Sequence, residues 1–190
     1  MNRFLLAFSL LACVSPVLAD PCKSGLQPDQ RPGPYSALVC VGKERGTQHC
    51  YICEAENRPI IIVFARSASE PLGKLAKKFD KAVAEHKASE LRVWFTFLSS
   101  DQAKMDPVIV QWAKTYALKA VPCAVFEDTV GPPTYLLNKE ADVTVLLSVN
   151  RKVIANFAYR VDELDDDAIA EIVKTVPKLM LAKKEPSSQK

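Results

Sequence analysis

Two cysteines separated by two residues are the group in this chain best suited to chemistry. Cys50 and Cys53 are the only cysteines with this spacing, in the sequence Cys-Tyr-Ile-Cys. Sulfurs at this separation can close a small ring as a disulfide, and their proximity lowers the pKa of one thiol. The pair predicts either thiol–disulfide exchange, in which one thiolate attacks a partner disulfide and the other resolves it, or a structural disulfide.

The same cysteines could instead belong to a metal site. His49 and Cys40 lie near them in the sequence, and a set of cysteines with one histidine suits zinc or copper. In a regular strand His49 and Cys50 would point to opposite sides, which counts against a shared ion. A haem attachment site needs histidine directly after Cys53, where this chain has Glu54, and no cofactor is predicted.

Residues 1–19 have the pattern of a secretory signal peptide. A basic start precedes an apolar run at 4–11, which is too short to span a membrane, and small residues precede a cleavage point before Asp20. A competing interpretation treats 10–13 as a lipobox with Cys13 lipidated, although leucine is a poor second residue for that motif. The sequence therefore predicts a secreted or periplasmic protein whose partners are other exported proteins, with lipid anchoring less favoured.

The remaining chain is long enough for one domain with a full core. The net charge is +3 over 190 residues, and acidic and basic residues are mixed along the sequence, so nothing favours nucleic acid as a partner. No second long apolar segment follows the first, so no membrane span is expected. The sequence gives no indication of the oligomeric state.

The number of cysteines carries a further prediction. Cleavage would remove Cys13 from the six cysteines and leave five, so at least one thiol must stay free, bind metal or pair with another chain. A disulfide between Cys22 and Cys40 would tether the start of the mature chain to the first strand. Cys123 falls in a short apolar segment, where a buried and unreactive thiol is expected.

The apolar pattern predicts alternating strands and helices. The segment 60–64 is continuously apolar and β-branched, as in a strand buried on both faces of a parallel sheet. Ser69 suits the N-cap of the following helix, which has Pro71 in its first turn. Further strands are expected at 36–41, 49–55, 91–98, 121–127, 143–149 and 153–159, with helices from Asp106 and Asp165 and one helical turn at 135–138.

This order of elements resembles the peroxiredoxin-like branch of the thioredoxin superfamily, the AhpC/TSA redoxins. The similar stretches are 60–66, 93–101, 112–128 and 143–156. The resemblance implies an α/β thioredoxin-like fold, a central mixed sheet with helices on both faces, extended here by an N-terminal β-hairpin.

The same interpretation divides the chain into four parts. The signal peptide at 1–19 is followed by an irregular lead-in and a β-hairpin that carries Cys50 and Cys53, together covering 20–58. The thioredoxin-like domain covers 59–181, and a polar tail covers 182–190.

The reactive cysteine of that family is missing. The family places it at the N-terminus of the helix after the first core strand, where the helix stabilises a thiolate, and this chain has Ser69 there. A serine hydroxyl cannot replace a thiolate in attack on peroxide, so no peroxidase is expected at this position. The cis-proline that thioredoxins keep beside their active site corresponds to Asp142 in the redoxin alignment, which we favour, or to Pro122 in a plain thioredoxin alignment.

The leading functional hypothesis is therefore an exported thioredoxin-fold protein with redox activity through Cys50 and Cys53. One alternative is a non-catalytic binding module that presents the helix N-terminus near Ser69, or a surface groove, to a partner. Another is a metal carrier that uses Cys40, His49 and the two paired cysteines. A fold alone does not choose among these functions.

Overall fold

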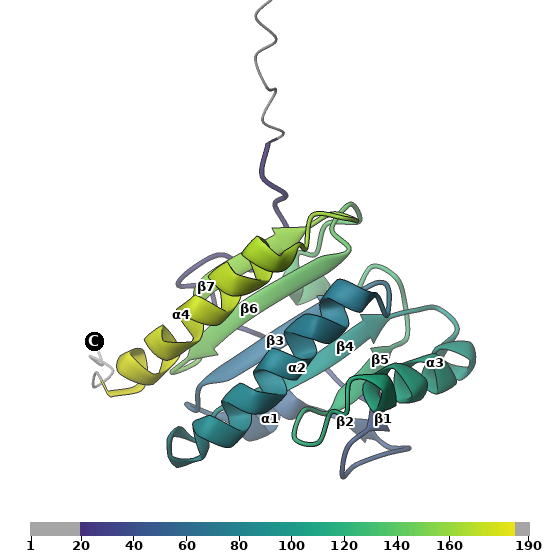
Figure 1. Ribbon diagram of the computed structural model, residues 1–190, viewed down its shortest axis with the longest axis horizontal. Helices are drawn as coiled ribbons and strands as arrows, with labels where there is room; N and C mark the ends of the chain where they lie inside the picture. The colour runs from purple at the N-terminus through teal and green to yellow at the C-terminus, as the bar shows by residue number, and fades with distance from the viewer. Residues whose placement is uncertain (1–19, 185–190) are drawn as a thin grey trace, which may run out of the picture.

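A single strand at the centre of the sheet, β3 (Ile60–Ala65), organises the fold. Every one of its residues is buried, as the continuous apolar run predicts. In the computed structural model, which describes residues 20–184, β3 pairs in parallel with β4 (Arg92–Leu98) and antiparallel with β6 (Val143–Val149). The fold is therefore built outward from a strand that has hydrogen-bonded neighbours on both edges (Figure 1).

The complete sheet has seven strands in the order β2-β1-β5-β4-β3-β6-β7. It is mixed, because β5 continues the parallel pairing beyond β4, whereas β1, β2 and β7 add antiparallel pairs. The outer strands are β1 (Ala37–Val41), β2 (Gln48–His49), β5 (Cys123–Phe126) and β7 (Lys152–Tyr159). The predicted α/β mixed sheet is confirmed, and the N-terminal hairpin is part of it through β1.

Three long helices cover one face of the sheet. They are α2 (Glu70–Glu85), α3 (Gln102–Thr115) and α4 (Asp166–Lys184), drawn in front of the strands in Figure 1. Their apolar stripes meet the alternating inward residues of β3, β4 and β6 in one core cluster. Fully buried side chains such as Phe79, Ile109 and Ile172 fill the space between helices and sheet.

The opposite face is covered mainly by chain without regular structure. The short helix α1 (Tyr51–Ala55), the lead-in around Leu26 and Tyr35, and Tyr135 form a second core cluster with β3 and β4. Polar contacts hold the lead-in to the sheet: Trp94 Nε1 donates to Tyr35 Oη at 3.0 Å, and Tyr35 Oη lies 2.7 Å from Thr96 Oγ1. Helices thus lie on both faces of the sheet, as expected, but one face has three long helices and the other has only the short α1 among the described residues.

Some predicted boundaries are wrong for local physical reasons. The helix expected to be capped by Asp106 begins at Gln102, because Asp101 Oδ1 accepts the Lys104 N–H at 3.0 Å and the cap therefore lies five residues earlier. Pro107 consequently lies inside the helix. The strand expected at 121–127 is shorter, at Cys123–Phe126, and the helical turn near Tyr135 is a 3₁₀ turn at Pro133–Tyr135.

The pairing of β6 helps to choose between the redoxin alignment and the plain thioredoxin alignment of this chain. Asp142 directly precedes β6, the antiparallel neighbour of β3, whereas Pro122 precedes β5, which pairs with β4. The Val121–Pro122 peptide bond is trans. This arrangement favours the redoxin alignment.

The predicted signal peptide and most of the polar tail lie outside the described residues, and within 20–184 no helix is long and apolar enough to cross a membrane.

Candidate functional site

Cys50 and Cys53 form a disulfide at the start of α1. Their Cα atoms lie 5.5 Å apart, and the Cys53 N–H donates to Cys50 Sγ at 3.3 Å. The prediction of a strand at 49–55 is wrong: β2 ends at His49, and Cys50 is the N-cap of α1. The cysteine pair therefore follows the hairpin instead of lying within it. One turn of helix brings the two sulfurs together, because residues three apart in a helix share a face.

The two cysteines differ in exposure. Cys53 is an exposed residue, whereas Cys50 is partly buried. An incoming thiolate therefore has freer access to Cys53. The sulfur of Cys50 is the one that accepts a backbone hydrogen bond, which stabilises negative charge on it when the disulfide opens.

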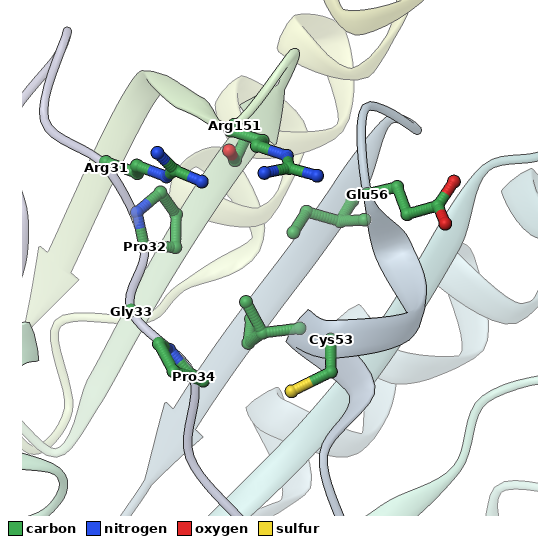
Figure 2. Close-up of a pocket in the computed structure, with 10 residues that line it drawn as sticks. Arg31, Pro32, Gly33, Pro34, Cys53, Glu56 and Arg151 are labelled. Carbon is green, nitrogen blue, oxygen red and sulfur yellow. The ribbon is translucent and has the colours of Figure 1, made fainter.

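A pocket of about 390 Å³ opens beside Cys53. It lies where β3 begins and β6 ends, since Ile60 and Ser148 line it and are register partners. The extended segment 32–34 forms the wall opposite Cys53 (Figure 2). The other lining residues are Arg31, Ile52, Glu56 and Arg151.

Two arginines give this pocket a cationic end. Arg31 from the lead-in and Arg151 from the β6–β7 turn lie at the end of the pocket away from Cys53 (Figure 2). Both are exposed, and among residues 20–184 neither side chain has a hydrogen bond or an ion pair. The Glu56 carboxylate points away from both guanidinium groups. The pocket therefore combines a disulfide, apolar walls and unneutralised positive charge.

His49 lies next to carboxylates. Its Nε2 is 3.1 Å from Glu54 Oε1, and possible ligand atoms of Glu44, His49 and Glu54 all lie within 4.8 Å of one another. The imidazole packs against Tyr51 with ring centroids 4.4 Å apart. The histidine predicted as a metal ligand is thus grouped with two carboxylates, and no cysteine of the described residues belongs to that group.

Cys40, the fourth member of the predicted metal set, lies in the core. It is fully buried in β1, and burial, with the side chain of Asp106 adding to it, raises the pKa of its thiol to about 12. With Cys50 and Cys53 joined to each other, Cys40 is the one free thiol of the set. A protonated, buried thiol is a poor metal ligand.

The other cysteines are also free thiols. The predicted disulfide between Cys22 and Cys40 is wrong: Cys22 lies near Arg160, and Cys40 packs under the helices. Cys123 is fully buried as expected, and burial raises the pKa of its thiol. The described chain therefore holds one disulfide and three thiols, which accounts for the odd cysteine of the predicted mature protein.

The C-terminal end of β3, where the resemblance to redoxins would place a cysteine, is closely packed. Ser69 caps α2 as predicted, with its Oγ accepting the Leu72 N–H at 3.4 Å. Its carbonyl accepts the indole N–H of Trp112 at 3.0 Å. Gly73, one turn into α2, lies under the ring of Tyr116, so closely that a Cβ on it would be 2.0 Å from Tyr116 Cε2.

No sequence signal identifies Arg31 or Arg151 as site residues. They belong to an irregular lead-in and to a hairpin turn, and nothing in the spacing of either relates it to Cys53. The backbone bonds Asp29 N–H to Val153 O at 2.8 Å and Val153 N–H to Gln30 O at 2.9 Å bring the two segments side by side. Only knowledge of that pairing would have revealed the shared pocket.

Comparison with known proteins supports the fold. No protein-family model matches the sequence, and no curated protein matches it significantly. Among solved structures, the chain is similar to a provisionally named protein disulfide isomerase from Bacteroides thetaiotaomicron, with 12% identity and a TM-score of 0.62 over 83% of this chain and 93% of that one.

Two further solved structures are similar to about the same degree. A provisionally named thiol:disulfide interchange protein DsbE from Chlorobium tepidum has 13% identity and a TM-score of 0.60, covering 83% of this chain and 98% of that one. AhpC from Enterococcus faecalis has 10% identity and a TM-score of 0.59, covering 86% and 98%. The chain therefore has the thioredoxin-like fold predicted from its sequence, shared with both disulfide-exchange proteins and peroxiredoxins.

Proposed function

We propose that this thioredoxin-fold protein is a thiol–disulfide oxidoreductase that acts through Cys50 and Cys53. The observation that carries the proposal is an exposed cysteine, Cys53, that is disulfide-bonded within one helical turn and lines a pocket. A disulfide that serves only structure is more often buried, and this one closes a very short loop that restricts few residues of the unfolded chain. The similarity to solved disulfide-exchange proteins adds support.

The difference between the two sulfurs sets the order of steps. A partner thiolate attacks Cys53 Sγ, a mixed disulfide forms, and the Cys50–Cys53 bond breaks with Cys50 leaving as a thiolate that accepts the Cys53 N–H. A second partner thiolate then attacks the partner sulfur of the mixed disulfide, and Cys53 leaves as a thiolate. Two electrons pass from the partner dithiol to the protein, and the partner becomes a disulfide. The reverse sequence reduces a partner disulfide.

The cellular setting follows from the same chemistry. A protein that keeps a disulfide works most readily outside the reducing cytosol, in a secreted or periplasmic location. The signal-peptide pattern of residues 1–19 and the DsbE-like neighbour support that location. The natural partners would then be other exported proteins or thiols of the same compartment.

A glutathione redox titration with mass-spectrometric detection of each cysteine tests the proposal. We expect Cys50 and Cys53 to shift together between dithiol and disulfide, at a potential above the roughly −300 mV typical of structural disulfides. Ser69→Ala should leave this titration unchanged. A pair that stays oxidised under strongly reducing buffer, and whose replacement lowers Tm without changing any exchange rate, would instead support the non-catalytic binding module.

Single-cysteine variants test the order of steps. In Cys50→Ser the remaining Cys53 is exposed, so a mixed disulfide with a partner should accumulate because its paired resolving thiol has been removed. In Cys53→Ser the remaining Cys50 is less accessible, and the same adduct should form more slowly. Adducts that form faster on Cys50 would reverse the assigned roles.

A further inference from the structure

The pocket beside Cys53 carries more information than the disulfide alone. It holds two cationic side chains, Arg31 and Arg151, that share one end and have no anionic partner among the described residues. Two like charges in one pocket repel each other, and an anion between them relieves that repulsion. The guanidinium group is also the side chain best matched to the planar geometry of a carboxylate.

The geometry of the pocket limits what such an anion can belong to. At about 390 Å³ the pocket falls in the range of small-ligand sites, roughly 300–1,000 Å³. Cys53 lies at one end and the arginines at the other, with the segment 32–34 along the side (Figure 2). Ile52 and Ile60 add apolar lining. A ligand that fills it would place an anionic group on the arginines and a second group against the sulfur.

We infer that the pocket selects small thiols and disulfides that carry a carboxylate, and that Arg31 and Arg151 are the residues that determine this specificity. The inference rests on the proposed redox function and adds a substrate class to it. An anionic thiol binds with its carboxylate at the two guanidinium groups, which holds its sulfur near Cys53 Sγ. Since the arginines do not contact the reacting sulfurs, they act by positioning the substrate.

The covalent steps use two molecules of the thiol. The first thiolate attacks Cys53 Sγ and forms a mixed disulfide, and Cys50 leaves as a thiolate. The second attacks the small-molecule sulfur of that adduct and forms the dimeric disulfide of the thiol, and Cys53 leaves as a thiolate. The protein disulfide gains two electrons, and the two small thiols lose them.

The test compares glutathione with its diethyl ester, which keeps the thiol but masks both carboxylates. The rate of reduction of the Cys50–Cys53 disulfide is measured by quenched alkylation and mass spectrometry and corrected for the thiolate fraction of each reagent. We expect glutathione to react roughly tenfold faster per thiolate than the ester, the size of one partly exposed charge-assisted contact. Dithiothreitol, a neutral dithiol, measures whether the disulfide exchanges at all.

Three variants separate positioning from structure. The double variant R31Q/R151Q should remove the preference for glutathione while leaving the rate with dithiothreitol unchanged. The double variant R31E/R151E should reverse the preference toward the ester. Arg92→Gln is the matched control, because Arg92 is an exposed arginine on β4 outside this pocket, and it should change neither rate.

The outcomes distinguish the two proposals. A disulfide that no thiol reduces, dithiothreitol included, overturns the redox function and this inference with it. Normal reduction by dithiothreitol with equal rates for glutathione and its ester, or a preference that survives R31Q/R151Q, overturns the inference alone. The same assay also uses a peptide with one cysteine and neighbouring acidic residues. If this peptide reacts much faster than glutathione, the small-molecule assignment is overturned, and the preferred substrates are acidic segments of protein chains.

Discussion

The two ends of β3 differ in what they offer to a substrate. At its C-terminal end, Ser69 begins a long, well-capped helix, and the side chains of α3 close over it. At its N-terminal end, roughly 20 Å away for six extended residues, a five-residue helix holds a disulfide beside an open pocket. The family resemblance would place the reactive cysteine at the C-terminal end of β3, but that end is closely packed and has no cysteine. The two cysteines lie instead at the N-terminal end, beside the open pocket.

If the proposed redox function holds, this contrast means that the fold has been kept while its reactive position differs. The dipole and cap of α2 are still present, but the indole of Trp112 and the ring of Tyr116 fill the space around its first turn. The residues of the proposed site lie outside the central strands and the helices that connect them. They come from the lead-in, α1 and the β6–β7 turn. Such segments tolerate change more readily than buried strands do.

The sharpest test of the contrast is peroxide chemistry. The double variant C50S/C53S retains only Cys22, Cys40 and Cys123 in the described chain, and none of these lies at the start of α2. Because burial raises the pKa of all three thiols, few thiolates are present at neutral pH, and stopped-flow measurement should show no catalysed peroxide consumption. Rapid turnover by this variant would show that one of these three thiols reacts with peroxide without the Cys50–Cys53 pair.

The next test concerns the packing of that end. Gly73→Ala should lower the free energy of unfolding by about 2 kcal/mol, because the new methyl group displaces Tyr116. An ordinary Gly-to-Ala change within a helix would instead stabilise the protein by up to about 1 kcal/mol. Urea denaturation measures the change in each case.

The matched control for this test is the same substitution made in a Tyr116→Ala background. With the ring removed, Gly73→Ala should be neutral or stabilising. A loss of similar size in both backgrounds would mean that the two residues do not compete for the same space.

A smaller effect is expected from the cap itself. Ser69→Ala should lower the free energy of unfolding by about 1 kcal/mol, since the Leu72 N–H loses its acceptor. Ser69→Asp, which also accepts this bond, should retain most of the stability. Loss of exchange activity without a change in Tm would contradict the purely structural role given to Ser69.

The smallest expected change in stability comes from a substitution beside the pocket at the N-terminal end of β3. Glu56, the C-cap of α1, has φ 51° and ψ −117°, a conformation that glycine adopts far more easily, in a turn closed by Arg58 N–H and Ala55 O. Glu56→Gly should therefore raise the free energy of unfolding by about 0.5 kcal/mol after the entropy of glycine is counted. Glu56→Ala, which cannot relieve the strain, is the control and should not stabilise the protein.

The parts of the fold that follow from local pattern could be predicted from the sequence. Three features are recognisable from a few consecutive residues each. They are the buried run 60–64, the Ser69 cap with Pro71 in the first turn, and the hairpin of β6 and β7. The start of α3 was misplaced because Asp101 and Asp106 are both good caps, and sequence alone does not say which one the preceding strand leaves in position.

The candidate site was predictable only in part. The spacing of Cys50 and Cys53 identifies them at once, but their short helix was hidden by the β-propensity of the surrounding residues. The contacts that complete the pocket are long-range, between the lead-in and the last hairpin, and leave no periodic signal. The carboxylates beside His49 are close to it in the sequence, but Glu44 reaches it across a turn and Glu54 from α1, where the sequence predicts a strand.

The threading of the lead-in across the sheet also has a consequence for the timing of folding. Ser24 Oγ lies 2.7 Å from Thr144 Oγ1, and Asn156 Nδ2 donates to the Ser24 and Leu26 carbonyls, so the first described residues are fixed by the last strands. Contacts of such high sequence separation form late, because a long loop must close before they contribute. During synthesis the disulfide-bearing turn emerges long before Arg151. A nascent or incompletely folded chain can therefore carry Cys50 and Cys53 without the pocket beside them, and the proposed selectivity among thiols would be a property of the fully folded protein alone.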